Sequence, residues 1–139
     1  MNAPLLLKLA SLTYLGLIAA GLLMPKVTGV WIEAKKMSPF AQGLFRTYYC
    51  FIGLCLVGFG LGSWVLAVEL SSGTTLARAA CGFLAVFWLI RLFAAIWILD
   101  VKPYLTSPWR RIGYQATNIV FGILPFFYGW LALRPTGVY

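Results

Sequence analysis

Histidine is absent from the 139 residues, and only Glu33, Glu69 and Asp100 carry a negative charge. Without histidine the chain can supply no Ser–His or Cys–His catalytic pair, and no imidazole ligand for haem, zinc or a chlorin magnesium. The three carboxylates are widely separated along the chain, which argues against a di-metal carboxylate site. We therefore expect that no cofactor is bound by this chain's own ligands, although a lipid or a hydrophobic cofactor held by a partner could lie against it.

The remaining side chains are poorly suited to catalysis. Acid–base chemistry inside a membrane would depend on Arg, Tyr or Cys, whose reference pKa values all lie above neutral pH. Cys50, Cys55 and Cys81 form no C-x-x-C pair and lie in apolar segments, where a thiol packs as a small apolar group. We therefore expect that the protein is not an enzyme.

Charged residues make up only 10% of the chain, whereas soluble domains contain about 25%. Hydrophobic residues reach 62% and the mean hydropathy is +0.90. Several apolar runs are long enough to cross a bilayer as helices. The sequence predicts one all-α domain over residues 1–139, an integral membrane four-helix bundle with spans at about 5–24, 40–69, 76–99 and 112–133. The first run has no convincing cleavage site, so we expect an anchor rather than a signal peptide.

The connections between these runs carry recognisable start and stop signals. Ser38-Pro39 and Ser107-Pro108 each place an N-capping serine before a proline suited to the first helical position. Residues 71–75 form a short polar turn, which predicts an antiparallel hairpin. Around Trp31, lysines and an aromatic ring indicate a short helix at the membrane interface. Pro125 is expected to kink the last helix.

The net charge of +8 comes from cations that flank the predicted spans. We therefore expect them to contact lipid headgroups and set the topology, with no nucleic acid among the partners. Seven cations lie on the side of the two longer loops and three lie on the side of the termini. The positive-inside rule then places both termini outside the cytoplasm. We expect a multi-pass protein of a cell membrane, with the bacterial inner membrane as the first candidate.

Arg91 is the strongest functional pointer, because it interrupts an apolar run about 12 Å from its end at Leu99. A cation at the centre of a span costs roughly 2.5–3.5 kcal/mol on insertion scales, so it is retained where something offsets that cost. A polar stripe on the last span lies at a similar depth. The candidate contact residues for a lipid or a partner are Arg91, Asn118, Gln115, Tyr114 and Trp88.

Two interpretations of Arg91 remain open from the sequence. In the first, Asn118, Gln115 and a tyrosine (Tyr48 and Tyr49 being within reach) satisfy the guanidinium, or it extends to the headgroups. In the second, Arg91 binds an anion or carbonyl from elsewhere: a lipid phosphate, a quinone-like head or an acidic side chain of a partner. Deep tryptophan rings would suit packing, or contact with a flat cofactor held by a neighbour.

Small residues mark candidate helix contacts. Gly58 and Gly62 form a small-xxx-small pair, and Gly122 and Gly129 follow the polar stripe of the last span. Such glycines let two helices approach closely, either within this bundle or against another chain.

The leading hypothesis is a small non-catalytic accessory subunit of a larger membrane complex, packed against partner subunits, lipids or partner-held cofactors. The alternative is a stand-alone lipid- or isoprenoid-binding membrane protein, perhaps a carrier, in which Arg91 contacts the polar head.

Overall fold

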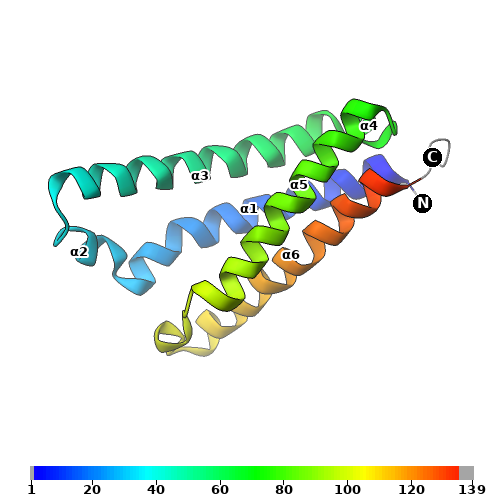
Figure 1. The fold of residues 1–139 in the computed structure, drawn as a ribbon. Helices are drawn as coiled ribbons and strands as arrows, with labels where there is room; N and C mark the ends of the chain where they lie inside the picture. Colours follow the sequence, from blue (N-terminus) through cyan, green and yellow to red (C-terminus); the bar gives the residue numbers. More distant parts are fainter. Residues whose placement is uncertain (1, 135–139) are drawn as a thin grey trace.

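The computed structural model describes residues 2–134, and over that range the chain is helical and contains no strand (Figure 1). Four helices are long and apolar enough to span a membrane, as predicted: α1, α3, α5 with its continuation η1, and α6. The full order is α1 (Ala3–Thr28), α2 (Val30–Ala34), α3 (Pro39–Val65), α4 (Ala67–Ser71), α5 (Thr75–Phe93), the π-helical turn η1 (Ala94–Ile98), the 3-10 turn η2 (Lys102–Tyr104) and α6 (Pro108–Leu133).

Both predicted Ser-Pro helix starts are confirmed. The Ser38 hydroxyl accepts a hydrogen bond from the Ala41 N–H, and the Ser107 hydroxyl accepts one from the Arg110 N–H, each at 3.3 Å. Each serine therefore satisfies an N–H group that has no acceptor inside its own helix. As a result α6 begins four residues before the span predicted from hydropathy alone.

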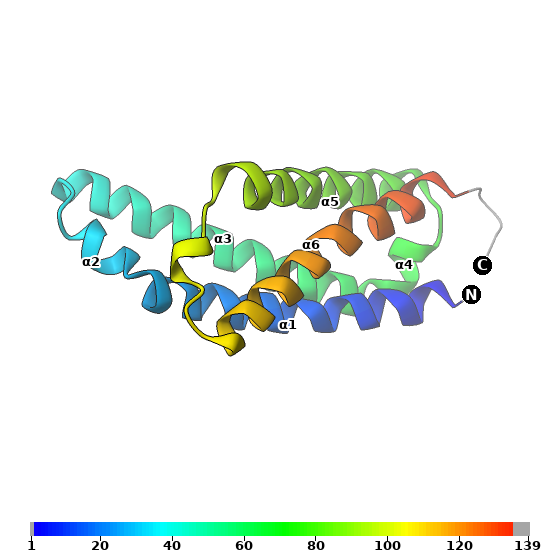
Figure 2. The same cartoon turned by 90° about the horizontal axis from the view of Figure 1, so that it is seen from below.

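The long helices form two pairs, because α1 packs along α3 and α5 packs along α6. The pairs lie close together at the end where α1 begins, α6 ends and α4 is located, which we call the terminal end (Figure 1). They diverge toward α2 and η2, which lie at the opposite, loop end. Figure 2 shows the same arrangement from below, with α4 again beside the terminal end and α2 far from it.

The first helix continues past its predicted end at residue 24, with Pro25 inside it. Proline has no N–H, so the carbonyl of Gly21, four residues earlier, lacks its usual helical donor. The Tyr49 hydroxyl of α3 donates a hydrogen bond to that carbonyl. This contact compensates the helix for the proline and joins α1 to α3.

The second predicted span, 40–69, is not one continuous helix. Helix α3 ends at Val65, Leu66 takes a non-helical conformation (φ −95°, ψ 25°), and α4 follows. Through this break α4 packs on α1, and both Ala67 and Ser71 become buried. The next turn contains Gly73 with a left-handed φ of 75°. Beyond it the chain reverses, but α5 diverges from α3 instead of packing along it as a hairpin (Figure 1).

We predict that Gly60→Ala destabilises the fold. A Cβ atom at Gly60 would lie 2.9 Å from the Cβ of Tyr14, an atom held close to the backbone of α1. Overpacking of this kind costs about 1–3 kcal/mol, so the thermal unfolding midpoint in detergent should fall. The matched control is Gly58→Ala on the same helix, where nothing lies within 4 Å of the added carbon. Equal midpoints for the two variants would contradict the contact between α1 and α3.

Candidate functional site

Four buried polar side chains meet inside the bundle, one from each long helix. We call them the polar junction: Tyr14 of α1, Ser63 of α3, Trp88 of α5 and Tyr128 of α6. None is more than 1% exposed. The junction therefore joins all four long helices through side chains alone.

The junction is a chain of hydrogen bonds. The indole N–H of Trp88 donates to the Tyr14 hydroxyl at 2.9 Å, the Tyr14 and Tyr128 hydroxyls lie 3.1 Å apart, and Tyr128 lies 2.7 Å from the Ser63 hydroxyl. Indole can only donate, so the order Trp88→Tyr14→Tyr128→Ser63 gives each tyrosine oxygen one bond accepted and one donated. Among the described residues, no buried side-chain nitrogen or oxygen lacks a partner. The junction is internally satisfied, which suits a structural role.

Arg91 lies one turn beyond Trp88 on α5. Its guanidinium carbon is 5.2 Å from the centroid of the Phe121 ring, which in turn stacks on Trp88 with centroids 5.7 Å apart. Within residues 2–134, the side chain of Arg91 has no hydrogen bond and no ion pair. Its donors therefore have no protein acceptor in the described part of the chain.

The position of Arg91 follows from the residues one turn earlier. Phe87 contacts Phe59 of α3 with ring centroids 5.0 Å apart, and Trp88 contacts Tyr14 of α1 at 5.4 Å. Residues three and four apart share a helix face, so Arg91 continues the face of α5 that meets the α1–α3 pair. The two pairs diverge toward the loop end (Figure 1). Arg91 therefore lies one turn beyond these two ring contacts, toward the loop end.

No family model, curated protein or solved structure matches this chain.

The polar stripe expected to face Arg91 makes no hydrogen bond with it in the described structure. Within this stripe, Asn118 and Tyr114 are half-buried, while Gln115 is exposed. The side chain of α6 that meets Arg91 is Phe121. The reason is that large residues set the buried face of α6, which consists of Phe121, Leu124, Pro125, Tyr128 and Leu131.

The two tyrosines expected within reach of Arg91 lie elsewhere. Tyr49 is bound to the Gly21 carbonyl, and its ring packs edge-on against Trp31 with centroids 5.3 Å apart. Tyr48 is exposed.

Only one of the four candidate packing glycines lies against a neighbouring helix. A Cβ at Gly129 would lie 4.0 Å from the Ala85 Cβ of α5, whereas one at Gly58, Gly62 or Gly122 would meet nothing within 4 Å. Among the glycines of the described residues, the tightest contact with another helix is at Gly60, which is not one of the four candidates. Gly60 is a small residue one turn before Ser63, which is a pattern typical of a helix contact. Its partner lies on another helix, so the sequence around Gly60 alone could not predict which residue it meets.

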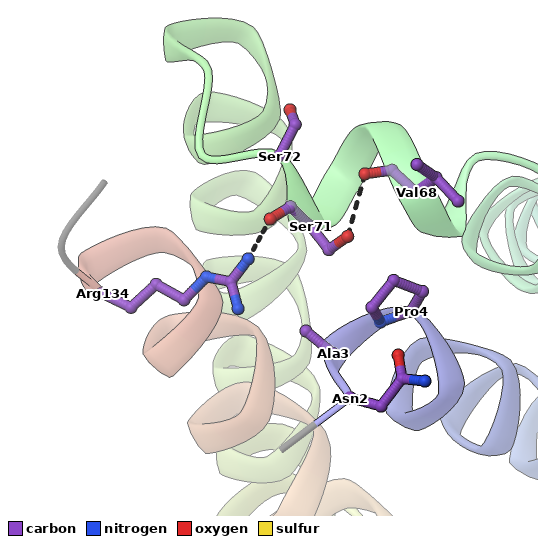
Figure 3. A pocket seen from close by; sticks show the side chains of 7 residues that line it. All are labelled: Asn2, Ala3, Pro4, Val68, Ser71, Ser72 and Arg134. Carbon is purple, nitrogen blue, oxygen red and sulfur yellow. Dashed lines mark hydrogen bonds between the residues drawn. The ribbon is translucent and has the colours of Figure 1, made fainter. Parts of the chain in front are cut away.

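A second feature missed by the sequence analysis is a pocket of about 500 Å³ at the terminal end (Figure 3). Arg134, which follows the last predicted span, is buried here. Its guanidinium donates to the Ser71 carbonyl and lies 5.6 Å from the Trp130 ring. The end of α4 leaves carbonyls without helical donors, and Arg134 supplies one. The pocket is lined by Asn2, Ala3, Pro4, Val68, Ser71, Ser72 and Arg134.

The described residues contain no cluster of three His, Cys, Asp or Glu that could hold a metal ion. The cysteines are unpaired; Cys81 is buried, with its sulfur 3.8 Å from the Leu70 carbonyl oxygen. The groups available for ligand chemistry are therefore the cations Arg91 and Arg134 and the rings around them.

We predict that Tyr128→Phe destabilises the bundle. The change removes both hydrogen bonds of Tyr128 and leaves the hydroxyls of Tyr14 and Ser63 short of a partner in a buried site. A buried group left without its partner costs about 1–3 kcal/mol, so the thermal unfolding midpoint should fall. The control is Tyr114→Phe on the same helix, which removes a half-buried hydroxyl that makes no hydrogen bond in the described structure. An unchanged midpoint for Tyr128→Phe would rule out the junction as a stabilising contact.

Proposed function

We propose that this chain is a small non-catalytic accessory subunit of a larger membrane complex, in which it packs against partner subunits, lipids or cofactors held by the partners. In this role it needs no catalytic residues and no cofactor ligands of its own. Its contribution is a rigid helical unit that presents particular side chains to its neighbours.

The observation that carries the proposal is that the side chain of Arg91 has no hydrogen-bond acceptor within the described residues. This cation lies inside a helix long and apolar enough to span a membrane, yet it makes only a ring contact within the described residues. Cations in such segments usually face a bundle interior or a water-filled cavity, where they pair with other groups. A partner subunit would provide the acceptor that residues 2–134 do not.

The surface of α3 gives independent support. Only Gly60 and Ser63 of this helix are buried, so α3 lies at the edge of the bundle. Gly58 lies two residues before Gly60, Gly62 lies directly before Ser63, and both have open space where a side chain would be. Glycines in spanning helices favour close helix–helix approach, and here that helix would belong to another chain.

Several large rings also point away from the bundle. Trp97 and Phe126 are 68% and 73% exposed. In a membrane such rings contact lipid chains, a partner helix or the hydrophobic part of a partner-held cofactor.

A second candidate function, binding of a lipid with an anionic headgroup, is supported by the terminal pocket. Arg134 contributes a cation beside the apolar residues Ala3, Pro4 and Val68. The pocket lies at the end of the helices, which is the level of the headgroups when the helices cross a bilayer. A stand-alone lipid-binding protein or carrier would use it to hold the head.

We expect the tagged chain, extracted in mild detergent from its own membrane, to copurify with other membrane subunits at fixed stoichiometry. Native mass spectrometry of the eluate measures this directly, with cells carrying the untagged chain as the control. A monodisperse monomer without partners would contradict the accessory role. A monomer with a lipid-sized adduct would favour the second function instead.

We also propose that both termini lie outside the cytoplasm and that the membrane is a bacterial inner membrane. The support for this orientation is the excess of cations near the loop end, where α2 and η2 lie. A reporter active only outside the cytoplasm should be active when fused after Tyr139 and inactive when fused after Thr106. The reverse pattern would show that both termini lie in the cytoplasm and would contradict the proposed orientation.

A further inference from the structure

We propose that Arg91 is the docking point for a carboxylate carried inside the membrane by a spanning helix of a partner subunit. This inference rests on the proposed accessory role and names the chemistry by which the partner is recognised. The partner helix would lie against the face of α5 that extends beyond its last contacts with α1 and α3.

The depth of the guanidinium argues for an acceptor within the membrane core. Phe121, whose ring lies against the guanidinium, is at the middle of the 26-residue helix α6, roughly 18–20 Å from either end at 1.5 Å per residue. Arg91 is seven residues before Ile98, the end of the candidate span, and helical side chains lean toward the helix N-terminus, here toward the middle of the span. The hydrocarbon core extends about 15 Å on each side of its centre, which places lipid phosphates too far away.

No carboxylate of this chain can occupy that position. Glu33 lies in α2 and pairs with Lys36 at 3.0 Å, and Asp100 follows η1 and accepts from the Lys102 N–H at 3.2 Å. Glu69 lies in α4 at the terminal end. All three are outside the four candidate spans, so the charge that complements Arg91 comes from another molecule.

The contact with Phe121 leaves Arg91 able to bind. A cation–π contact uses the flat face of the guanidinium, whereas its five N–H donors point outward in the plane. Two of these donors match the two oxygens of a carboxylate in a bidentate pair. Stacking on Trp88 holds the Phe121 ring in place, and with it the face of the guanidinium that lies against this ring.

The neighbouring residues leave room for a helix. Ala94 lies three residues after Arg91 and is half-buried, whereas Ala95 is already packed in the core of this chain. The small side chain of Ala94 lets a second spanning helix approach closely beside Arg91. A partner helix with one Asp or Glu at mid-depth therefore fits both the shape and the charge of this face.

The test compares tagged full-length variants by the partner-to-chain ratio in native mass spectrometry, with lipid adducts recorded in the same spectra. Arg91→Gln removes the charge and should lower the ratio by about tenfold or more, because a desolvated charge pair loses one member. Arg91→Lys keeps the charge but not the bidentate geometry, so we expect an intermediate ratio. The control is Arg46→Gln, an exposed cation of α3, which should leave the ratio unchanged. The unfolding midpoint of each purified variant shows that the fold is retained.

Three outcomes separate the inference from the proposed function. If Arg91→Gln keeps its partners at the wild-type ratio, the docking point is wrong while the accessory role stands. If the wild-type chain has no partner, the accessory role fails and the inference fails with it. If Arg91→Gln loses a lipid-sized adduct but no subunit, the ligand of Arg91 is a lipid head, and the carboxylate is overturned.

Discussion

The hydrogen bond between the hydroxyls of Tyr14 and Tyr128 joins the first long helix to the last, and the rest of the arrangement depends on it. In a membrane, apolar side chains gain little by leaving lipid for another helix, so polar contacts and close packing decide which helices meet. Trp88 and Ser63 extend this bond to the other two long helices. Gly60 makes the geometry possible, because only a residue without a side chain lets α3 approach Tyr14 so closely.

The same requirement explains the contacts at the ends of the bundle. Tyr49 donates to the Gly21 carbonyl that Pro25 leaves without a helical partner. At the terminal end, Arg78 donates to the Ala132 carbonyl at 2.8 Å, and Arg134 donates to the carbonyl of Ser71. Each of these side chains supplies a donor to a carbonyl of a different helix. Arg91 departs from this pattern, since it has donors and no acceptor within the described residues.

Hydropathy and capping signals were enough to predict the four long helices and the starts of α3 and α6. Those features depend on residues close together in sequence. The break at Leu66 could not be predicted, because it arises from the packing of Ala67 and Ser71 after the helices have met. The expected pairing of Arg91 with Asn118 and Gln115 was mispredicted for a related reason. In a membrane a polar stripe is expected to face the bundle interior, but in α6 the large residues Phe121, Leu124 and Tyr128 form the buried face.

The ring of Phe121 links the polar junction, whose hydrogen bonds are satisfied, to Arg91, whose donors have no acceptor within the described residues. One contact of this ring is with Trp88, a member of the polar junction, and the other is with Arg91. A carboxylate that binds Arg91 would fix the guanidinium and thereby restrain Phe121 against Trp88. Any ligand that binds only the folded state stabilises that state by mass action. Assembly with a partner at Arg91 would therefore strengthen the same helix contacts that the junction already holds, so that fold and assembly are coupled through one aromatic stack.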